Sequence, residues 1–163
     1  MYERSYGYRY DEGAKLTTAE IAKLIRRDIK TAKDEGLLPK TWKYSVRTSR
    51  GSMCSAIDVT VRNCADAWQA CPGYKIGSRQ ELPGGGWTAT GCGDVWCKAG
   101  GQYRDSPHAS DHTVLTEEAS VAKMTLERIH GAYNHDGSDS MVDYFDVNYY
   151  GHVSFERDGF AVS

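Results

Sequence analysis

Two cysteines and two histidines in the second half of the chain have a spacing close to that of a zinc-binding set. Cys92 and Cys97 are separated by four residues, His108 lies ten residues further on, and His112 follows after three more. Thiolates and neutral imidazoles at such separations can surround Zn²⁺, and a segment with little core of its own gains folding free energy from a metal. The middle spacer is shorter than in common zinc fingers. Unliganded thiols and loop histidines are therefore the favoured interpretation, and a structural zinc, with Cys64 and Cys71 as substitute ligands, is the alternative.

Other reactive combinations are present but carry weaker signals. Cys54 or Cys97 paired with a histidine would give a nucleophile, although a thiol needs a neighbouring positive charge to become a thiolate. Clustered carboxylates suit hard cations, and such a cluster is formed by Asp136, Asp139, Asp143 and Asp146. Asp and Gly in this stretch more commonly shape a turn. A hydrolase that depends on Cys/His or carboxylate chemistry is therefore kept as a second alternative.

The best candidate for a binding surface lies on a strand expected from about residue 143 to 156. Apolar side chains recur with a period of two at Phe145, Val147, Tyr149, Val153 and Phe155, which predicts that these side chains face a core. The other face then carries aromatic and hydrogen-bonding groups, and two arginines of a preceding hairpin join it. We expect this face to bind a partner through Arg47, Arg62, Tyr144, Asp146, Asn148, Tyr150 and His152.

Two helices and a hairpin are expected to position that face. Thr17 and Thr18 precede a run of strong helix formers that ends at Gly36, and Thr116 begins a second helix that reaches about residue 133. Alternation over residues 42–47 and 57–62 predicts two strands joined by a tight connection. If their apolar residues pack under the first helix, one outer face carries Lys43, Ser45, Arg47, Asp58, Thr60 and Arg62.

The remaining middle of the chain reads as an irregular insertion. Residues 63–113 are rich in Gly, contain four of the five cysteines and lack a sustained hydrophobic period. We expect one short hairpin there, around residues 87–96. We therefore predict a single α+β domain over residues 1–163, with two helices packed on one face of a mainly antiparallel sheet. The Gly- and Cys-rich insertion at about 63–113 interrupts this domain.

Composition narrows the class of partner. The 163 residues suffice for one core, and a net charge of −2 argues against a protein that holds duplex nucleic acid by charge alone. No run of eighteen apolar residues occurs, and the N-terminus lacks a hydrophobic signal core. We therefore expect no membrane partner and a location in the cytoplasm. The oligomeric state is not predicted.

Several motifs resemble a known family. These are Leu16-Thr-Thr-Ala-Glu-Ile-Ala-Lys-Leu-Ile-Arg-Arg, Tyr44-Ser-Val-Arg, Ile57-Asp-Val, and Asp136-Gly-Ser-Asp-Ser followed by Asp143-Tyr-Phe-Asp-Val. Residues 16–61 and 113–155 are similar to the large polyvalent-protein-associated domains of phage and mobile-element proteins, in particular to the twenty-ninth class. The resemblance implies an α+β fold and a setting inside a bacterial host. It implies no particular reaction.

The function expected from these observations is binding without catalysis. We expect a small phage or mobile-element protein that binds a host protein, for example to blunt a defence system or to redirect a host process. The first alternative is a nucleic-acid or nucleotide binder that uses the polar sheet face, with or without a structural zinc. Apart from this structural zinc, we expect no cofactor.

Overall fold

The computed structural model describes residues 5–52, 54–71, 73, 79–81, 87–89, 96–99, 101–111, 113–138, 146–157 and 160–162. The chain divides into two compact units, one made of Met1–Ala65 with Glu118–Ser163 and the other of Asp66–Glu117. The second unit closely follows the expected insertion, while a single domain stays a prediction. Helices and mainly antiparallel sheets confirm the expected α+β class.

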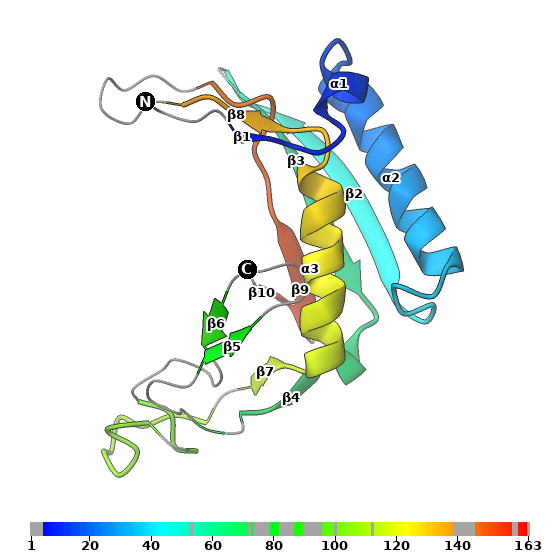
Figure 1. Cartoon of the computed structure of the whole chain (residues 1–163). Coiled ribbons are helices and arrows are strands. Elements are labelled where there is room, and N and C mark those ends of the chain that lie inside the picture. The colour runs from blue at the N-terminus through cyan, green and yellow to red at the C-terminus, as the bar shows by residue number, and fades with distance from the viewer. Residues whose placement is uncertain are drawn as a thin grey trace. The chain divides into compact units, whose positions relative to one another are not determined.

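Four strands form the main sheet of the first unit, in the order β10–β9–β3–β2 (Figure 1). They are β2 (Lys43–Arg50), β3 (Ser55–Arg62), β9 (Val153–Arg157) and β10 (Phe160–Val162). The pairs β2–β3 and β9–β10 are antiparallel, and the hairpin expected over residues 42–62 is confirmed. β3 and β9 are parallel, which requires a crossover connection, and this connection contains helix α3 (Glu117–Gly131).

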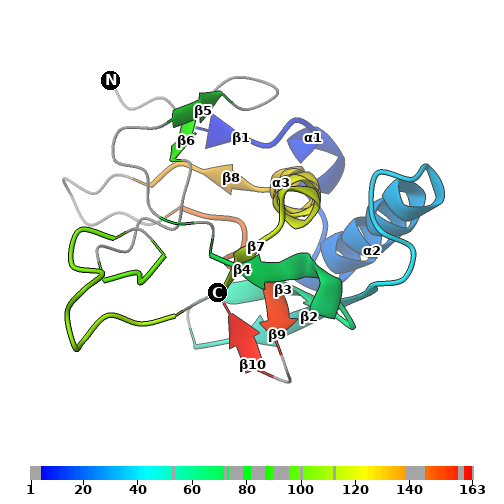
Figure 2. The same ribbon diagram turned by 90° about the horizontal axis from the view of Figure 1, so that it is seen from below.

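Both long helices lie on the same side of this sheet, as Figure 2 shows. Helix α2 (Thr18–Asp34) begins with a capping box, in which the Thr17 hydroxyl accepts from the Glu20 amide and the Glu20 carboxylate accepts from the Thr17 amide. The helices bury Ile21, Ala22, Ile25, Ile29, Ala32, Ala119, Ala122, Leu126 and Ile129. The sheet contributes Val46, Ile57, Val59, Val61, Val153 and Phe155 to this core. The other face of the sheet consequently carries the polar side chains of these strands.

The described N-terminal residues are tied to this core. Strand β1 (Ser5–Tyr6) pairs with β8 (His135–Asp136), and the short helix α1 (Tyr10–Gly13) follows. Arg9 binds the Asp28 carboxylate at 2.7 Å, and the Tyr133 hydroxyl donates to the same carboxylate at 2.5 Å. This polar cluster links the arm, α2 and the end of α3.

The second unit contains only short strands in its described part. β4 (Trp68–Ala70) follows a 3-10 turn at Ala65–Ala67 and pairs with β7 (Thr113–Leu115), and β5 (Arg79–Glu81) pairs with β6 (Trp87–Ala89). The β5–β6 pair shares only residues 87–89 with the span 87–96 for which a hairpin was predicted, and residues 90–95 lie outside the described residues. Among the described residues of this unit, regular structure is limited to these short strands and the 3-10 turn.

The final strand is shorter than the expected span of about 143–156. Gly151 interrupts it with a φ of +130°, and a Cβ at this position would lie 1.9 Å from the Ile57 carbonyl oxygen. Upstream of the break, Tyr150 still bridges Ala56 in the parallel register that β9 keeps with β3. The predicted burial is confirmed for Tyr149, Val153 and Phe155, and Val147 is half-buried. Phe145 lies outside the described residues.

Candidate binding surface

The register of the hairpin brings the predicted polar residues together on one face. Lys43 lies opposite Arg62, Ser45 opposite Thr60, and Arg47 opposite Asp58. On the other side of β3, Thr60 pairs with Ser154 and Ala56 with Tyr150. Together these residues are called the outer face below. It contains Lys43, Ser45, Arg47, Ser49, Ala56, Asp58, Thr60, Arg62, Tyr150, His152, Ser154 and Glu156.

Contacts between its own residues engage part of the outer face. Arg62 Nε lies 2.8 Å from Glu156 Oε1, and His152 Nδ1 lies 3.3 Å from Asp58 Oδ1. The Asp58 carboxylate also accepts a 3.3 Å hydrogen bond from the His152 amide.

Two cations at the β2 edge of the outer face remain exposed. The side chains of Lys43 and Arg47 form no ion pair with any residue in the described part of the chain. Lys43 lies across from the like charge of Arg62, and Asp58, which lies across from Arg47, is engaged by His152. Tyr150, with 42% of its surface exposed, adds an aromatic side chain on the other side of β3.

Two of the predicted binding residues lie elsewhere. Asp146 Oδ1 binds His135 Nε2 at 3.1 Å, and the Asn148 side-chain amide donates to the Tyr133 carbonyl at 3.2 Å. Both side chains hold the chain around β8 rather than extend the outer face. The face therefore gathers Arg47, Arg62, Tyr150 and His152 of the predicted set, while Tyr144 lies outside the described residues.

The residues proposed for zinc are only partly described. His108 is exposed with its ring edge-on to Trp96, and Cys97 is buried with its Sγ 3.5 Å from that of Cys71. Cys92 and His112 lie outside the described residues. Within the described part, no group of three or more His, Cys, Asp or Glu side chains is arranged to hold a metal ion. Cys64, the other substitute ligand, is buried, and its thiol donates to the Glu156 carbonyl at 3.3 Å.

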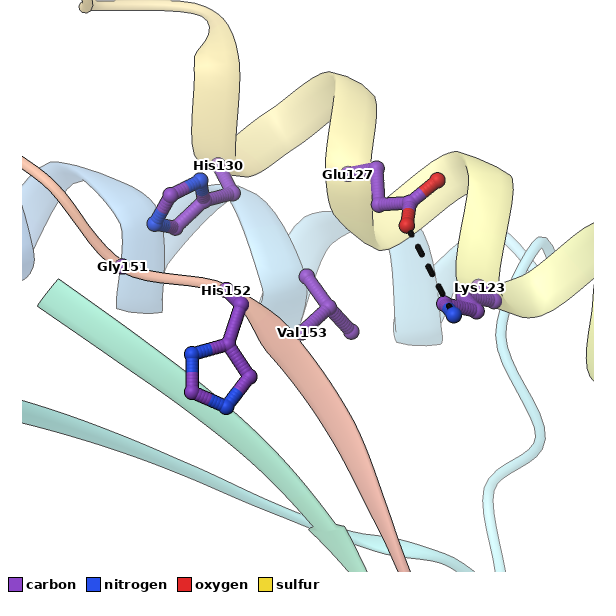
Figure 3. Close-up of a pocket in the computed structure, with 6 residues that line it drawn as sticks. All are labelled: Lys123, Glu127, His130, Gly151, His152 and Val153. Atoms are coloured by element: carbon purple, nitrogen blue, oxygen red, sulfur yellow. Dashed lines mark ion pairs between the residues drawn. The ribbon is translucent and has the colours of Figure 1, made fainter. Parts of the chain in front are cut away.

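A cavity of about 350 Å³ opens between α3 and the residues that precede β9 (Figure 3). Lys123, Glu127 and His130 line it from the helix, and Gly151, His152 and Val153 line it from the other side. Lys123 Nζ lies 3.9 Å from Glu127 Oε1. A lysine, a carboxylate and two imidazoles in one cavity are the kinds of group used in acid–base catalysis, so the direction of the two rings decides what this cavity can do.

The two imidazoles do not point at a common centre. Figure 3 shows the His152 ring directed away from α3, whereas the His130 ring extends toward the chain at Gly151. His130 Nε2 lies 2.7 Å from the Ile57 carbonyl oxygen and so donates to it. Burial lowers the pKa of His130 below its ordinary value of 6.5, against a smaller opposing effect of this hydrogen bond. His130 is therefore a neutral, hydrogen-bonded histidine and forms no acid–base pair with His152.

The break at Gly151 explains why His130 donates to the Ile57 carbonyl. In an uninterrupted parallel ladder the His152 amide would donate to the Ile57 carbonyl, since the Tyr150 and His152 carbonyls accept from the Ile57 and Val59 amides. Here the His152 amide turns to Asp58, and His130 satisfies the Ile57 carbonyl instead. Neither His130 nor Glu156 was among the predicted site residues. The period of two across β9 could have placed Glu156 on the outer face, but nothing local indicated the role of His130.

Comparison with family models, curated proteins and solved structures finds no match to this chain. The resemblance to the polyvalent-protein-associated domains thus stays a prediction. In the part of the chain that the structure describes, no helix has both the length and the apolar character needed to cross a membrane.

Proposed function

We propose that this chain is a non-catalytic binding protein whose outer face docks a protein partner. The observation that carries the proposal is the pair of exposed cations, Lys43 and Arg47, on a polar sheet face whose other charged groups pair with one another. Cations without a partner in the described part of the chain can form ion pairs across an interface, and such pairs speed association and fix the register of binding.

The balance of charge on this face favours a protein partner over nucleic acid. Nucleic-acid affinity comes largely from many cations that each neutralise a phosphate. Here Asp58 and Glu156 lie among the cations and engage His152 and Arg62, so that no continuous basic stripe forms along the described strands. A surface of mixed charge suits the mixed charge of another protein.

The biological setting in this proposal comes from the resemblance at residues 16–61 and 113–155. In that setting the partner is a component of a bacterial host, and binding takes place in the host cytoplasm to blunt a defence system or redirect a host process. The diverging rings of His130 and His152 support a binding function rather than catalysis at the α3 cavity.

The test compares two substitutions on the same strand. Arg47→Glu reverses a charge on the outer face, and Arg50→Glu makes the same change at an exposed position whose side chain belongs to the opposite face by strand alternation. The intact protein and both variants are used to capture partners from a bacterial lysate with and without nuclease treatment, and affinity for the captured protein is then measured. We expect Arg47→Glu to weaken binding by about tenfold or more and Arg50→Glu to leave it nearly unchanged.

Two results would contradict the proposal. Equal binding by both variants would exclude the outer face as the docking surface. Capture that disappears after nuclease treatment, with an affinity that falls steeply as salt rises, would instead establish the nucleic-acid alternative.

A further inference from the structure

In the described part of the chain, one edge of β2 has no neighbouring strand. β2 is the last strand in the order β10–β9–β3–β2, so β3 pairs with only one of its two edges (Figure 1). Such an edge presents N–H and C=O groups at the spacing that a further strand would use, and proteins commonly protect it. The direction of these groups therefore decides whether β2 can accept another strand.

Hydrogen bonds on the far side of β3 fix the direction of its backbone groups. The Ile57 and Val59 amides donate to the Tyr150 and His152 carbonyls at 2.8 and 3.0 Å, so the odd-numbered residues of β3 bond toward β9. The even-numbered residues of β3 consequently bond toward β2. In β2 the odd-numbered residues lie opposite these and complete the hairpin ladder, which leaves the even-numbered residues of β2 pointing outward.

Part of this outward edge is open. The Arg26 guanidinium, which comes from α2, donates to the Val46 carbonyl at 2.6 Å and so covers that position. No hydrogen bond from another described residue involves the outward N–H and C=O groups of Thr48 and Arg50, and both residues are exposed. These backbone groups, in ladder spacing, therefore lie open next to the exposed cation Arg47.

We infer that the partner docks by adding an extended acidic segment as a further strand along β2. The inference rests on the proposed docking function of the outer face and specifies what the partner brings to it. Main-chain hydrogen bonds to Thr48 and Arg50 supply affinity, and side chains at alternate positions supply specificity. A carboxylate on the outer-face side of the added strand then lies beside Arg47.

The charge of β2 determines which kind of strand it accepts. Its eight residues include Lys43, Arg47 and Arg50 and no acidic residue. A second copy of β2 would bring three further cations to the same edge, and like charges across a strand pair are destabilising. An acidic segment reverses the sign of this interaction. The cations that oppose self-association therefore favour the proposed partner.

The test uses the unsubstituted full-length chain and a synthetic peptide with blocked ends, in which Glu alternates with Thr. Two isomers of this peptide carry N-methyl groups, one on every Glu and the other on every Thr, so each isomer lacks the N–H donors along one edge of the extended peptide. Only one edge of the peptide pairs with β2, whichever direction the peptide runs. We expect one isomer to lose affinity by about tenfold or more and the other to bind like the unmethylated peptide.

Two further comparisons locate the contact. Replacing every Glu of the peptide with Lys should weaken binding by about tenfold or more. Thr48→Pro removes an outward N–H, a change that edge strands tolerate where the N–H faces solvent, and Thr48→Val is the matched control that keeps this N–H. We expect only Thr48→Pro to weaken binding. The peptide should also slow amide exchange at Thr48 and Arg50, and not at Arg47 and Ser49, whose amides already bond within the hairpin.

The two Thr48 variants also separate this inference from the docking proposal. If they bind the captured host protein equally well while Arg47→Glu weakens binding, the outer face docks its partner through side chains alone, and the added strand is wrong. If Arg47→Glu has no effect on that protein, the docking proposal itself fails.

Four other results would overturn the inference. They are equal affinity of the two N-methylated isomers, equal affinity of the Glu and Lys peptides, no binding at about 1 mM peptide, and a dimer of the chain that Thr48→Pro dissociates. The last result would show that the edge pairs with a second copy. Because the peptides are compared on the unsubstituted chain, a folding defect in Thr48→Pro does not alter the decision.

Discussion

Replacing Gly151 with alanine should strongly destabilise the first unit. The residue has a φ of +130°, where an L side chain is strained by about 1–2 kcal/mol. The new Cβ would also lie 1.9 Å from the Ile57 carbonyl oxygen and 2.6 Å from its carbon, so β9 would have to move away from β3. Overpacking of this kind costs about 1–3 kcal/mol, and we expect a total loss of about 2–5 kcal/mol.

Gly36→Ala is the matched control for this prediction. Gly36 follows α2 with a φ of +81°, and nothing lies within 4 Å of a Cβ built there. It therefore tests the strain of a positive φ without a steric clash, and we expect a loss of about 1 kcal/mol. The difference between the two variants measures the close approach of the chain to Ile57.

The assay combines urea unfolding with amide hydrogen exchange. With a slope of about 2 kcal/mol per molar urea, the Gly151→Ala midpoint should fall by about 1 M or more. Exchange should accelerate most at the Ile57 and Val59 amides, which donate to the Tyr150 and His152 carbonyls. Equal midpoints for Gly151→Ala and Gly36→Ala, or unchanged exchange at these two amides, would refute the reasoning.

Two further predictions concern polar groups of the same unit. Tyr133→Phe removes a hydrogen bond to the mostly buried Asp28 carboxylate, which Arg9 and Arg27 still bind. We expect the free energy of unfolding in urea to fall by about 1.5 kcal/mol for Tyr133→Phe and to change very little for the exposed control Tyr150→Phe. Equal losses for the two variants would contradict this prediction. Burial holds the pKa of His130 below 6.5, so the unfolded chain takes up this proton first. The part of the free energy of unfolding that depends on neutral His130 should be fully present above about pH 6.5 and should decrease as the pH falls below that value. His130→Gln should remove this part of the pH dependence of stability. An identical pH profile for the variant would show that His130 does not contribute.

Local patterns predicted most of the first unit. The Thr17 cap and the Gly36 stop mark the ends of α2, and the alternation of residues 43–47 and 57–62 predicts both the hairpin and its outer face. These features depend on neighbours in the sequence or on a single tight turn. The α+β class followed from them, and the structure confirms it.

Features that depend on distant contacts could not be predicted in this way. Three such features join residues that no local period relates. They are the parallel pairing of β3 with β9, the hydrogen bond between His135 and Asp146, and the contact between Cys71 and Cys97. The alternation of residues 144–156 also suggested one uninterrupted strand, because a Gly in an otherwise regular pattern does not show whether its φ is positive. The assignment of Asp146 and Asn148 to the polar face depended on that uninterrupted strand.

The break at Gly151 also determines which charges the outer face presents. Arg47 and Asp58 are directly opposed across β2 and β3, a placement that normally favours an ion pair. The turn at Gly151 instead directs both the amide and the ring of His152 to Asp58, since His130 already satisfies the Ile57 carbonyl. Arg47 consequently remains exposed at the edge of the sheet. A change at Gly151 that restored a regular ladder would release Asp58 to Arg47, and the proposed docking surface would lose a cation without any substitution in the surface itself.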